Sequence, residues 1–135
     1  MIYEIGISIT NGWIVWVNGP YPPGEWNDLK IAKACLVHHL DDGEKYVADK
    51  GYQDGDKFSV TPSGYNFFNH EYMKLIRARH EGVNRSFKRF GILKETYRHN
   101  LKKHVIILKA VTNIVQLKIR MYGPQYEVKW DEEIN

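Results

Sequence analysis

One acidic side chain in this sequence stands among cations. Glu81 has Arg77 four residues before it and Arg85 four residues after it. At about 100° per residue, Arg77, Glu81 and Lys88 fall on one narrow stripe of a helix, which Asn84 shares. Such a carboxylate can bind a divalent cation while the bases contact phosphates, or it can pair with the arginines at helical spacing. The residue pattern alone leaves both interpretations open.

The opposite side of the same helix is apolar, as packing on a core requires. The apolar side chains on that side are Tyr72, Ile76, Val83, Phe87 and Phe90. The pattern predicts one long amphipathic helix over roughly 69–90, with its charged face outward. Arg85 and Arg89 extend the basic character of that face, so the helix is a candidate DNA-binding element.

A second candidate acid, Asp49, follows the short apolar run Tyr46-Val47-Ala48, which we interpret as a strand. Carboxylates at a strand end and on a helix are rigid, hard ligands. They can hold two Mg²⁺ or Mn²⁺ ions about 3.5–4 Å apart for phosphodiester chemistry. The plainer interpretation is that Asp49 is a turn residue.

Composition describes an ordinary globular protein. The chain has 135 residues, 43% of them hydrophobic and 26% charged, which suits one domain with a real core. The single cysteine, Cys35, excludes an internal disulfide and favours a reducing, intracellular compartment. No apolar run reaches membrane-spanning length and the start has no basic segment, so we expect neither a membrane span nor a signal peptide.

Charge is unevenly distributed along the chain. Residues 1–70 carry five lysines against nine acids, a net −4, whereas residues 71–103 carry ten bases against three acids, a net +7. A basic helix beside an acidic region suits a bound polyanion with metal ions held by the acids. A solvated helix face explains the same charges without any ligand.

Hydrophobic periodicity and turn signals predict an α/β layer pattern. Before the basic helix we expect a strand over 3–10, an Asn11-Gly12 turn, a strand over 13–17 and a loop over 18–24. These elements are followed by a helix over 28–40 capped by Asn27, a strand over 45–48 and an irregular loop over 53–68. After the basic helix, a short helix or linker runs through Tyr97. The long apolar segment 101–121 is β-branched, but its length favours a helix. We assign 1–122 to one domain portion and 123–135 to an acidic tail.

Other polar residues receive structural interpretations. Asp54 and Asp56 are turn residues of the 53–68 loop. The histidines match no zinc-binding spacing and are interpreted as surface or partly buried side chains. The roles of His99 and His104 stay undefined at this level.

Two motifs carry a family resemblance. Ala48-Asp49-Lys50-Gly51-Tyr52, followed by Arg77, Glu81 and Lys88 at their spacing, resembles the DDE transposase endonuclease domain. Other stretches are similar to the PIF/Harbinger-like group of that superfamily. These stretches are 3–9, 19–28, 79–84, 98–104 and the pairs Ala110-Val111 and Gln116-Leu117. The resemblance covers nearly the whole chain.

The resemblance implies an RNase H-like fold and a three-acid site that cleaves DNA and transfers strands with Mg²⁺ or Mn²⁺. Asp49 would be the second acid and Glu81 the third, and both would bind metal. Asp28 matches another recurrent acid of the family, ranked second to Asp49 because it also suits a helix start. Arg77 and Lys88 would be signature bases that meet phosphates. Lys74 stands where the family has a tyrosine.

The resemblance also implies something missing. The family's first acid lies on a central strand upstream of the stretch that matches 3–6, and the sequence begins at Met1. We therefore expect a partial RNase H-like fold without its first central strand, and weak or no nuclease activity alone. Unpaired strand edges would favour self-association or a protein partner.

Three functional classes therefore stay open. The chain is a transposase-derived nuclease of the nucleus, a non-enzymatic DNA- or protein-binding module, or a decayed gene fragment. Cleavage, salt-dependent binding and folding, respectively, distinguish these classes.

Overall fold

The computed structural model describes residues 1–55, 57–61, 70–94 and 100–124, which form two compact units. The first unit contains Met1–Glu4 and Gly19–His70, and the second contains Ile5–Asn18 and Glu71–Asn135. The interpretations of Asp56, His99, the linker through Tyr97 and nearly all of the acidic tail lie outside the described residues. No helix within the described ranges is long and apolar enough to cross a membrane.

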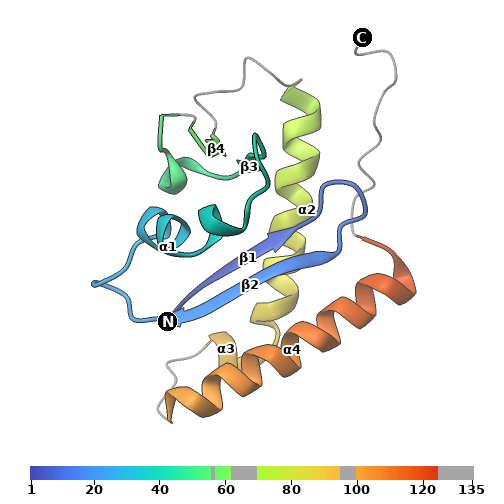
Figure 1. Cartoon of the computed structure of the whole chain (residues 1–135). Helices are drawn as coiled ribbons and strands as arrows, with labels where there is room; N and C mark the ends of the chain where they lie inside the picture. The colour runs from blue at the N-terminus through green and yellow to red at the C-terminus, as the bar shows by residue number, and fades with distance from the viewer. Residues whose placement is uncertain (56, 62–69, 95–99, 125–135) are drawn as a thin grey trace. The chain divides into compact units, whose positions relative to one another are not determined.

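The chain begins with an antiparallel hairpin, as predicted. Strand β1 (Ile2–Ile7) pairs with β2 (Ile14–Tyr21), and the division between the two units runs across both strands (Figure 1). At the turn, Gly12 has φ +72, and a Cβ there would lie 2.6 Å from the Cβ of Pro124. Glycine is therefore required for both its conformation and its lack of a side chain.

Strand β2 continues further than the sequence suggested, through the first four residues of the predicted loop 18–24 to Tyr21. Gly19 permits this, because a Cβ there would lie only 2.8 Å from the carbonyl oxygen of Ile2. The glycine lets the two strands stay close at the open end of the hairpin, where a larger residue would force them apart.

The predicted helix over 28–40 is instead split in two. Helix α1 (Asp28–Ala34) ends where Cys35 leaves helical geometry, and a 3₁₀ helix, η1 (Leu36–His39), follows. The ring Nδ1 of His39 lies 3.0 Å from the carbonyl oxygen of Cys35. A continuous α-helix would give that carbonyl to the backbone amide of residue 39, so the side chain competes with the helix.

Two short strands complete the first unit. Strand β3 (Tyr46–Val47) lies within the predicted 45–48 strand and pairs in parallel with β4 (Ser59–Val60). A 3₁₀ turn, η2 (Lys50–Tyr52), follows β3. Strand β4 was not predicted, because two residues carry too little periodicity to be distinguished from a loop.

The second unit contains the long helices. Helix α2 (His70–Lys88) matches the predicted basic helix, and α3 (Gly91–Lys94) is a single short turn after it. Helix α4 (Leu101–Tyr122) confirms the helical interpretation of 101–121. The side chain of Asn100 caps α4, and Gly123 ends it. The buried apolar side chains of α2 and α4 are Met73, Ile76, Val83, Phe87, Leu108, Val111, Val115 and Ile119.

Side chains of both long helices hold the tip half of the hairpin. Buried Arg79 of α2 donates from Nη1 to the carbonyl oxygen of Ile9 over 2.7 Å. Gln116 of α4 accepts a 2.7 Å hydrogen bond from the amide of Ile14. In Figure 1, β1 accordingly lies beside α2 and β2 beside α4. Helix side chains thus fix two residues of the hairpin, Ile9 and Ile14. A third residue, Ile5, is fixed by His80 of α2.

The contact to Ile5 also defines the protonation of a histidine. Nε2 of His80 lies 2.7 Å from the carbonyl oxygen of Ile5, which can only accept, so Nε2 donates. Asn84 Nδ2 lies 3.3 Å from the other ring nitrogen. Asn84, predicted on the polar stripe, therefore serves to orient His80. These bonds fix the rotation of α2 and hence the direction of its charged face.

The fold is mixed α/β, with an antiparallel hairpin, two short parallel strands and flanking helices. That level of the sequence prediction is confirmed.

Candidate functional site

Asp28 stands at the first position of α1. The side chain of Asn27 caps the helix by accepting a 2.8 Å hydrogen bond from the amide of Lys30. The cap was predicted, and it frees the carboxylate of the next residue from a capping role. Asp28 is half-buried and points its carboxylate toward the turn that follows β3.

Asp49, two residues beyond β3, is brought next to Asp28. Its Oδ1 accepts a 2.9 Å hydrogen bond from the amide of Gly51. A Cβ added at Gly51 would lie 3.0 Å from Asp28 Oδ2 and 3.1 Å from Asp49 Oδ1. Both carboxylate oxygens therefore touch the same small space, and the missing side chain of Gly51 lets them approach.

This proximity has an electrostatic consequence. Burial raises the pKa of Asp28, and the charge of Asp49 raises it further. A carboxyl group with a raised pKa is less stable in its charged form, so a bound cation would relieve the repulsion. The first unit therefore brings two candidate acids, Asp28 and Asp49, together.

The ring of Tyr52 lies in the field of the same acids. Burial raises the pKa of Tyr52, and the charges of Asp28, Glu4 and Asp49 raise it further. Tyr46, whose ring meets that of Tyr52 edge-on at 5.9 Å between centroids, has its pKa raised to about 12, mainly by burial. Both phenols stay protonated at neutral pH.

Glu4 of β1 is the residue that sequence reasoning missed. Its side chain is only 4% exposed, and its charge raises the pKa of both Tyr46 and Tyr52. The sequence showed Glu4 only as a polar member of an alternating strand, which usually faces solvent. Neither its burial nor its neighbours could be read from that pattern.

Asp54, in contrast, has a purely structural role, as predicted. Its carboxylate accepts hydrogen bonds from the amides of Lys57 and Phe58, at 3.1 and 3.0 Å, and from the hydroxyl of Ser59 at 2.9 Å. Burial acts to raise the pKa of Asp54, but these bonds outweigh it and hold the pKa below its usual range. Asp54 thus shapes the loop that leads into β4.

The donor set suits a hard divalent cation only in part. Asp28 and Asp49 supply carboxylate oxygens, the ligands that Mg²⁺ and Mn²⁺ prefer. Among the described residues, no three His, Cys, Asp or Glu side chains gather closely enough to hold a metal ion. Mg²⁺ commonly binds through one or two carboxylates together with water and substrate phosphates, so the pair fits such an ion.

The predicted basic stripe is present on α2. All of its predicted charged side chains are exposed, Asn84 is half-buried, and Lys74 lies on the same side of the helix. The exposed charged residues of the stripe are Lys74, Arg77, Glu81, Arg85, Lys88 and Arg89. A helix end this basic is a favourable surface for phosphates.

Glu81 is exposed in the middle of that stripe and belongs to the second unit, whereas Asp28 and Asp49 belong to the first. The interpretation of Glu81 as a salt-bridge partner of Arg77 or Arg85 stays a prediction, as does its pairing with Asp49.

Comparison of this chain with protein-family models, curated proteins and solved structures finds no match.

Proposed function

We propose that this chain is part of a DDE-type endonuclease domain that resembles the PIF/Harbinger-like group. Its substrate class is DNA, its cofactor is Mg²⁺ or Mn²⁺, and its place is the nucleus. The fold we propose is a partial RNase H-like one. The antiparallel hairpin and the short strand that precedes Asp49 are the elements that support this.

One observation carries the proposal. The exposed face of α2 and the residue after it carry four bases, Arg77, Arg85, Lys88 and Arg89, near the single acid Glu81. A face that serves only solubility usually intersperses acids among its bases. Bases gathered around one acid suit phosphate contacts beside a metal ligand.

The described residues have distinct tasks in this proposal. Arg77, Arg85, Lys88 and Arg89 bind DNA phosphates and orient the strand along α2. Asp28 and Asp49 hold a divalent cation through hard oxygen atoms, and Glu81 acts as the further acid of the site. When bound, Mg²⁺ or Mn²⁺ activates the attacking water and stabilises the leaving oxygen.

A non-enzymatic DNA-binding module is the second candidate. The observation in its favour is that all predicted bases lie on one helix, whereas the acids are divided between the two units. Binding needs only the helix, while cleavage needs all the acids together. We expect weak or no cleavage by this chain alone.

Cleavage of supercoiled plasmid with Mn²⁺ tests the enzymatic proposal. Cleavage that is lost in Glu81→Gln and in Asp49→Asn supports it, and cleavage that survives both substitutions contradicts it. Absence of cleavage by a folded chain that binds DNA favours the module. A chain that does not fold alone favours the gene fragment.

Binding of a fluorescent DNA duplex across a salt series tests the module. Arg85→Ala/Lys88→Ala should weaken binding about tenfold and lower the salt slope by about 2, since two phosphate contacts are lost. Lys102→Ala/Lys103→Ala removes the same charge from exposed positions of α4 and is the matched control. Equal weakening by both pairs would mean that only net charge matters, and would contradict a site on α2.

A further inference from the structure

Helix α4 has two apolar faces, and among the described residues only one of them is packed. The packed face consists of His104, Leu108, Val111, Val115 and Ile119, all of which are buried. The second face consists of Ile106, Ala110, Ile114, Leu117 and Met121, all of which are exposed. The second set is called the outer stripe of α4 below.

The outer stripe is continuous. Its residues recur at intervals of three and four, so they form a single row along a helix of 22 residues. Ile106 is 66% exposed, Leu117 58% and Met121 64%. Isolated exposed apolar residues are ordinary, but a row of this length on one helix is typical of an interaction surface.

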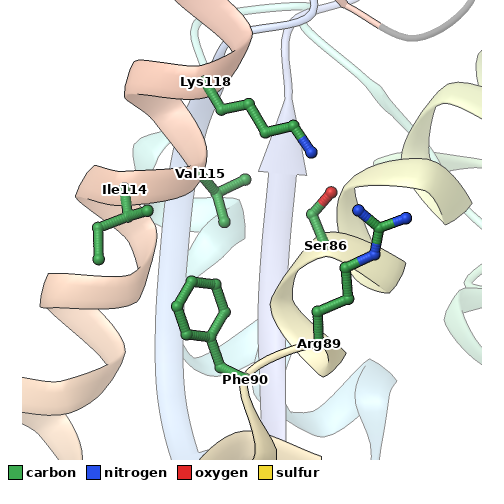
Figure 2. A pocket seen from close by; sticks show the side chains of 6 residues that line it. All are labelled: Ser86, Arg89, Phe90, Ile114, Val115 and Lys118. Carbon is green, nitrogen blue, oxygen red and sulfur yellow. The ribbon is translucent and has the colours of Figure 1, made fainter.

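A hollow adjoins this row. It has a volume of about 200 Å³ and lies between the end of α2 and the middle of α4. The residues that line it are Ser86, Arg89, Phe90, Ile114, Val115 and Lys118. Figure 2 shows the ring of Phe90 below Val115 and the amine of Lys118 reaching toward Ser86. Ile114 belongs to both the hollow and the outer stripe, so the two form one surface.

The charge of this surface indicates which kind of partner segment it can bind. Helix α4 contains four lysines and one arginine but no acidic residue. Arg89, the residue after α2, adds a further exposed cation at the hollow. A second copy of α4 placed on this surface would bring like charges together, which is unfavourable. An acidic segment would instead complement the apolar row and its basic flanks.

We propose that the outer stripe of α4 and the adjoining hollow bind an acidic amphipathic helix of a partner protein. The apolar side chains of that helix pack along the outer stripe, and one of them enters the hollow against Phe90 and Val115. Its carboxylates pair with Lys118 and Arg89 at the hollow, and with Lys109 further along. This is the helix-in-groove mode of recognition, and it is independent of any catalytic role of the chain.

A synthetic peptide tests this surface. The probe is a fluorescein-labelled helix of about three heptads, with leucine along one face and glutamate elsewhere. Fluorescence anisotropy should show saturable binding to the whole chain. Ile106→Ser/Leu117→Ser should weaken it at least tenfold, because two apolar contacts are lost. Val15→Ser changes a side chain of β2 that is also 66% exposed, and should leave binding unchanged.

The charge requirement is tested separately. Lys109→Gln/Lys118→Gln should weaken binding about fivefold, and a peptide with lysine in place of each glutamate should not bind. Circular dichroism melting checks that each variant stays folded. If Ile106→Ser/Leu117→Ser does not fold, Lys109→Gln/Lys118→Gln still tests the surface. Equal binding of the two peptides, no binding at all, or no effect of the outer-stripe variants would overturn the proposal.

Other occupants give other results. Duplex DNA, or vesicles of phosphatidylcholine with about a quarter phosphatidylserine, should bind no differently to Ile106→Ser/Leu117→Ser. If that variant abolishes vesicle or DNA binding while the acidic peptide fails to bind, the surface serves those ligands and the proposal is wrong. A concentration-dependent dimer of the chain alone, lost in the same variant, would assign the surface to a second copy instead.

Discussion

Asp54 and the Asp28–Asp49 pair are aspartates of the same unit in opposite surroundings. The carboxylate of Asp54 is surrounded by donors from the loop before β4, which lower its pKa. The carboxylate of Asp28 is partly buried beside another acid, which raises its pKa. The surroundings of Asp54 stabilise its charged form, whereas the surroundings of Asp28 destabilise its charged form.

The difference distinguishes an acid that builds a loop from one that is available to a ligand. Every strong partner of Asp54 comes from its own loop, so its charge is already compensated. Among the described residues, the amide of Gly51 is the one hydrogen-bond donor to the two carboxylates of the pair, and it donates to Asp49. Acids held together without compensation are typical of functional sites, where stability is lower than it could be.

The largest effect is expected from Asp54→Ala. The substitution leaves the amides of Lys57, Phe58 and Ser59 without their acceptor. We expect a loss of about 2 kcal/mol in the free energy of unfolding, measured by urea denaturation. Asp54→Asn keeps one acceptor oxygen and should cost about half as much.

Asp42→Ala is the control, because Asp42 is an exposed acid of the same unit. It should change the free energy of unfolding by less than about 0.5 kcal/mol. If Asp42→Ala and Asp54→Ala cost the same, the loop does not depend on the Asp54 carboxylate and the comparison fails.

Substitution of two glycines, Gly55 in the loop of Asp54 and Gly51 beside the Asp28–Asp49 pair, gives the next largest effect on stability. Gly55 has φ +74 with nothing within 4 Å of an added Cβ, whereas an added Cβ at Gly51 meets both carboxylates. Gly55→Ala should cost about 1 kcal/mol through backbone strain alone, and Gly55→Asn should recover most of that loss because asparagine tolerates this conformation. Urea denaturation measures both.

At Gly51 the same series should behave differently. Gly51→Ala should cost less, about 0.5 kcal/mol, because the carboxylates can shift by a few tenths of an ångström. Gly51→Asn should be no better than Gly51→Ala, since the obstacle is space and not conformation. Recovery by asparagine at Gly51 but not at Gly55 would reverse the assignment of the two glycines.

Sequence reasoning reached the elements whose signals are strong and local. The Asn11-Gly12 hairpin, the cap at Asn27 and the charged face of α2 each follow from adjacent or helically spaced residues. It failed where the cause is a side-chain or backbone contact that the residue pattern does not show. The 28–40 helix is interrupted at Cys35, whose carbonyl oxygen meets the amide of His38 and the ring of His39. The hydrogen bond from Arg79 to Ile9 spans 70 residues and has no sequence signal.

The candidate site divides in the same way. Asp49 and Glu81 were candidates from their positions in the sequence and the resemblance added Asp28, but how far each side chain is buried is not encoded by residue type. Buried Glu4 was missed because an alternating strand gives no measure of what covers each face. The exposure of the outer stripe of α4 was not predicted, since an apolar row has the same sequence pattern whether it is packed or exposed.

A smaller effect of opposite sign is expected at the pair. Asp28→Asn removes a charge that burial and Asp49 oppose, so it should raise stability at pH 7 by about 0.3 kcal/mol, a value kept small by solvent screening. Because the folded pKa of Asp28 is raised, the folded state binds its proton more tightly, and this gain should shrink as pH falls toward about 4. Asp54 has a lowered folded pKa, so its contribution is present above about pH 4 and lost below it. Urea denaturation of Asp28→Asn and Asp54→Ala at several pH values measures how each free-energy change depends on pH. A gain from Asp28→Asn that grows on acidification would contradict the raised pKa.

The smallest and most direct effect is on titration itself. Carboxyl carbon chemical shifts, followed by NMR against pH, should place Asp28 above and Asp54 below the ordinary aspartate value of about 3.9. In Asp49→Asn the pKa of Asp28 should fall, because its neighbouring charge is gone, but it should stay above the ordinary value, because burial is the larger cause. The pKa of Asp54 should not move, since its cause lies in its own loop. If the pKa of Asp28 is unchanged in Asp49→Asn, the two carboxylates do not sense each other, and the argument that they form one cation site loses its electrostatic basis.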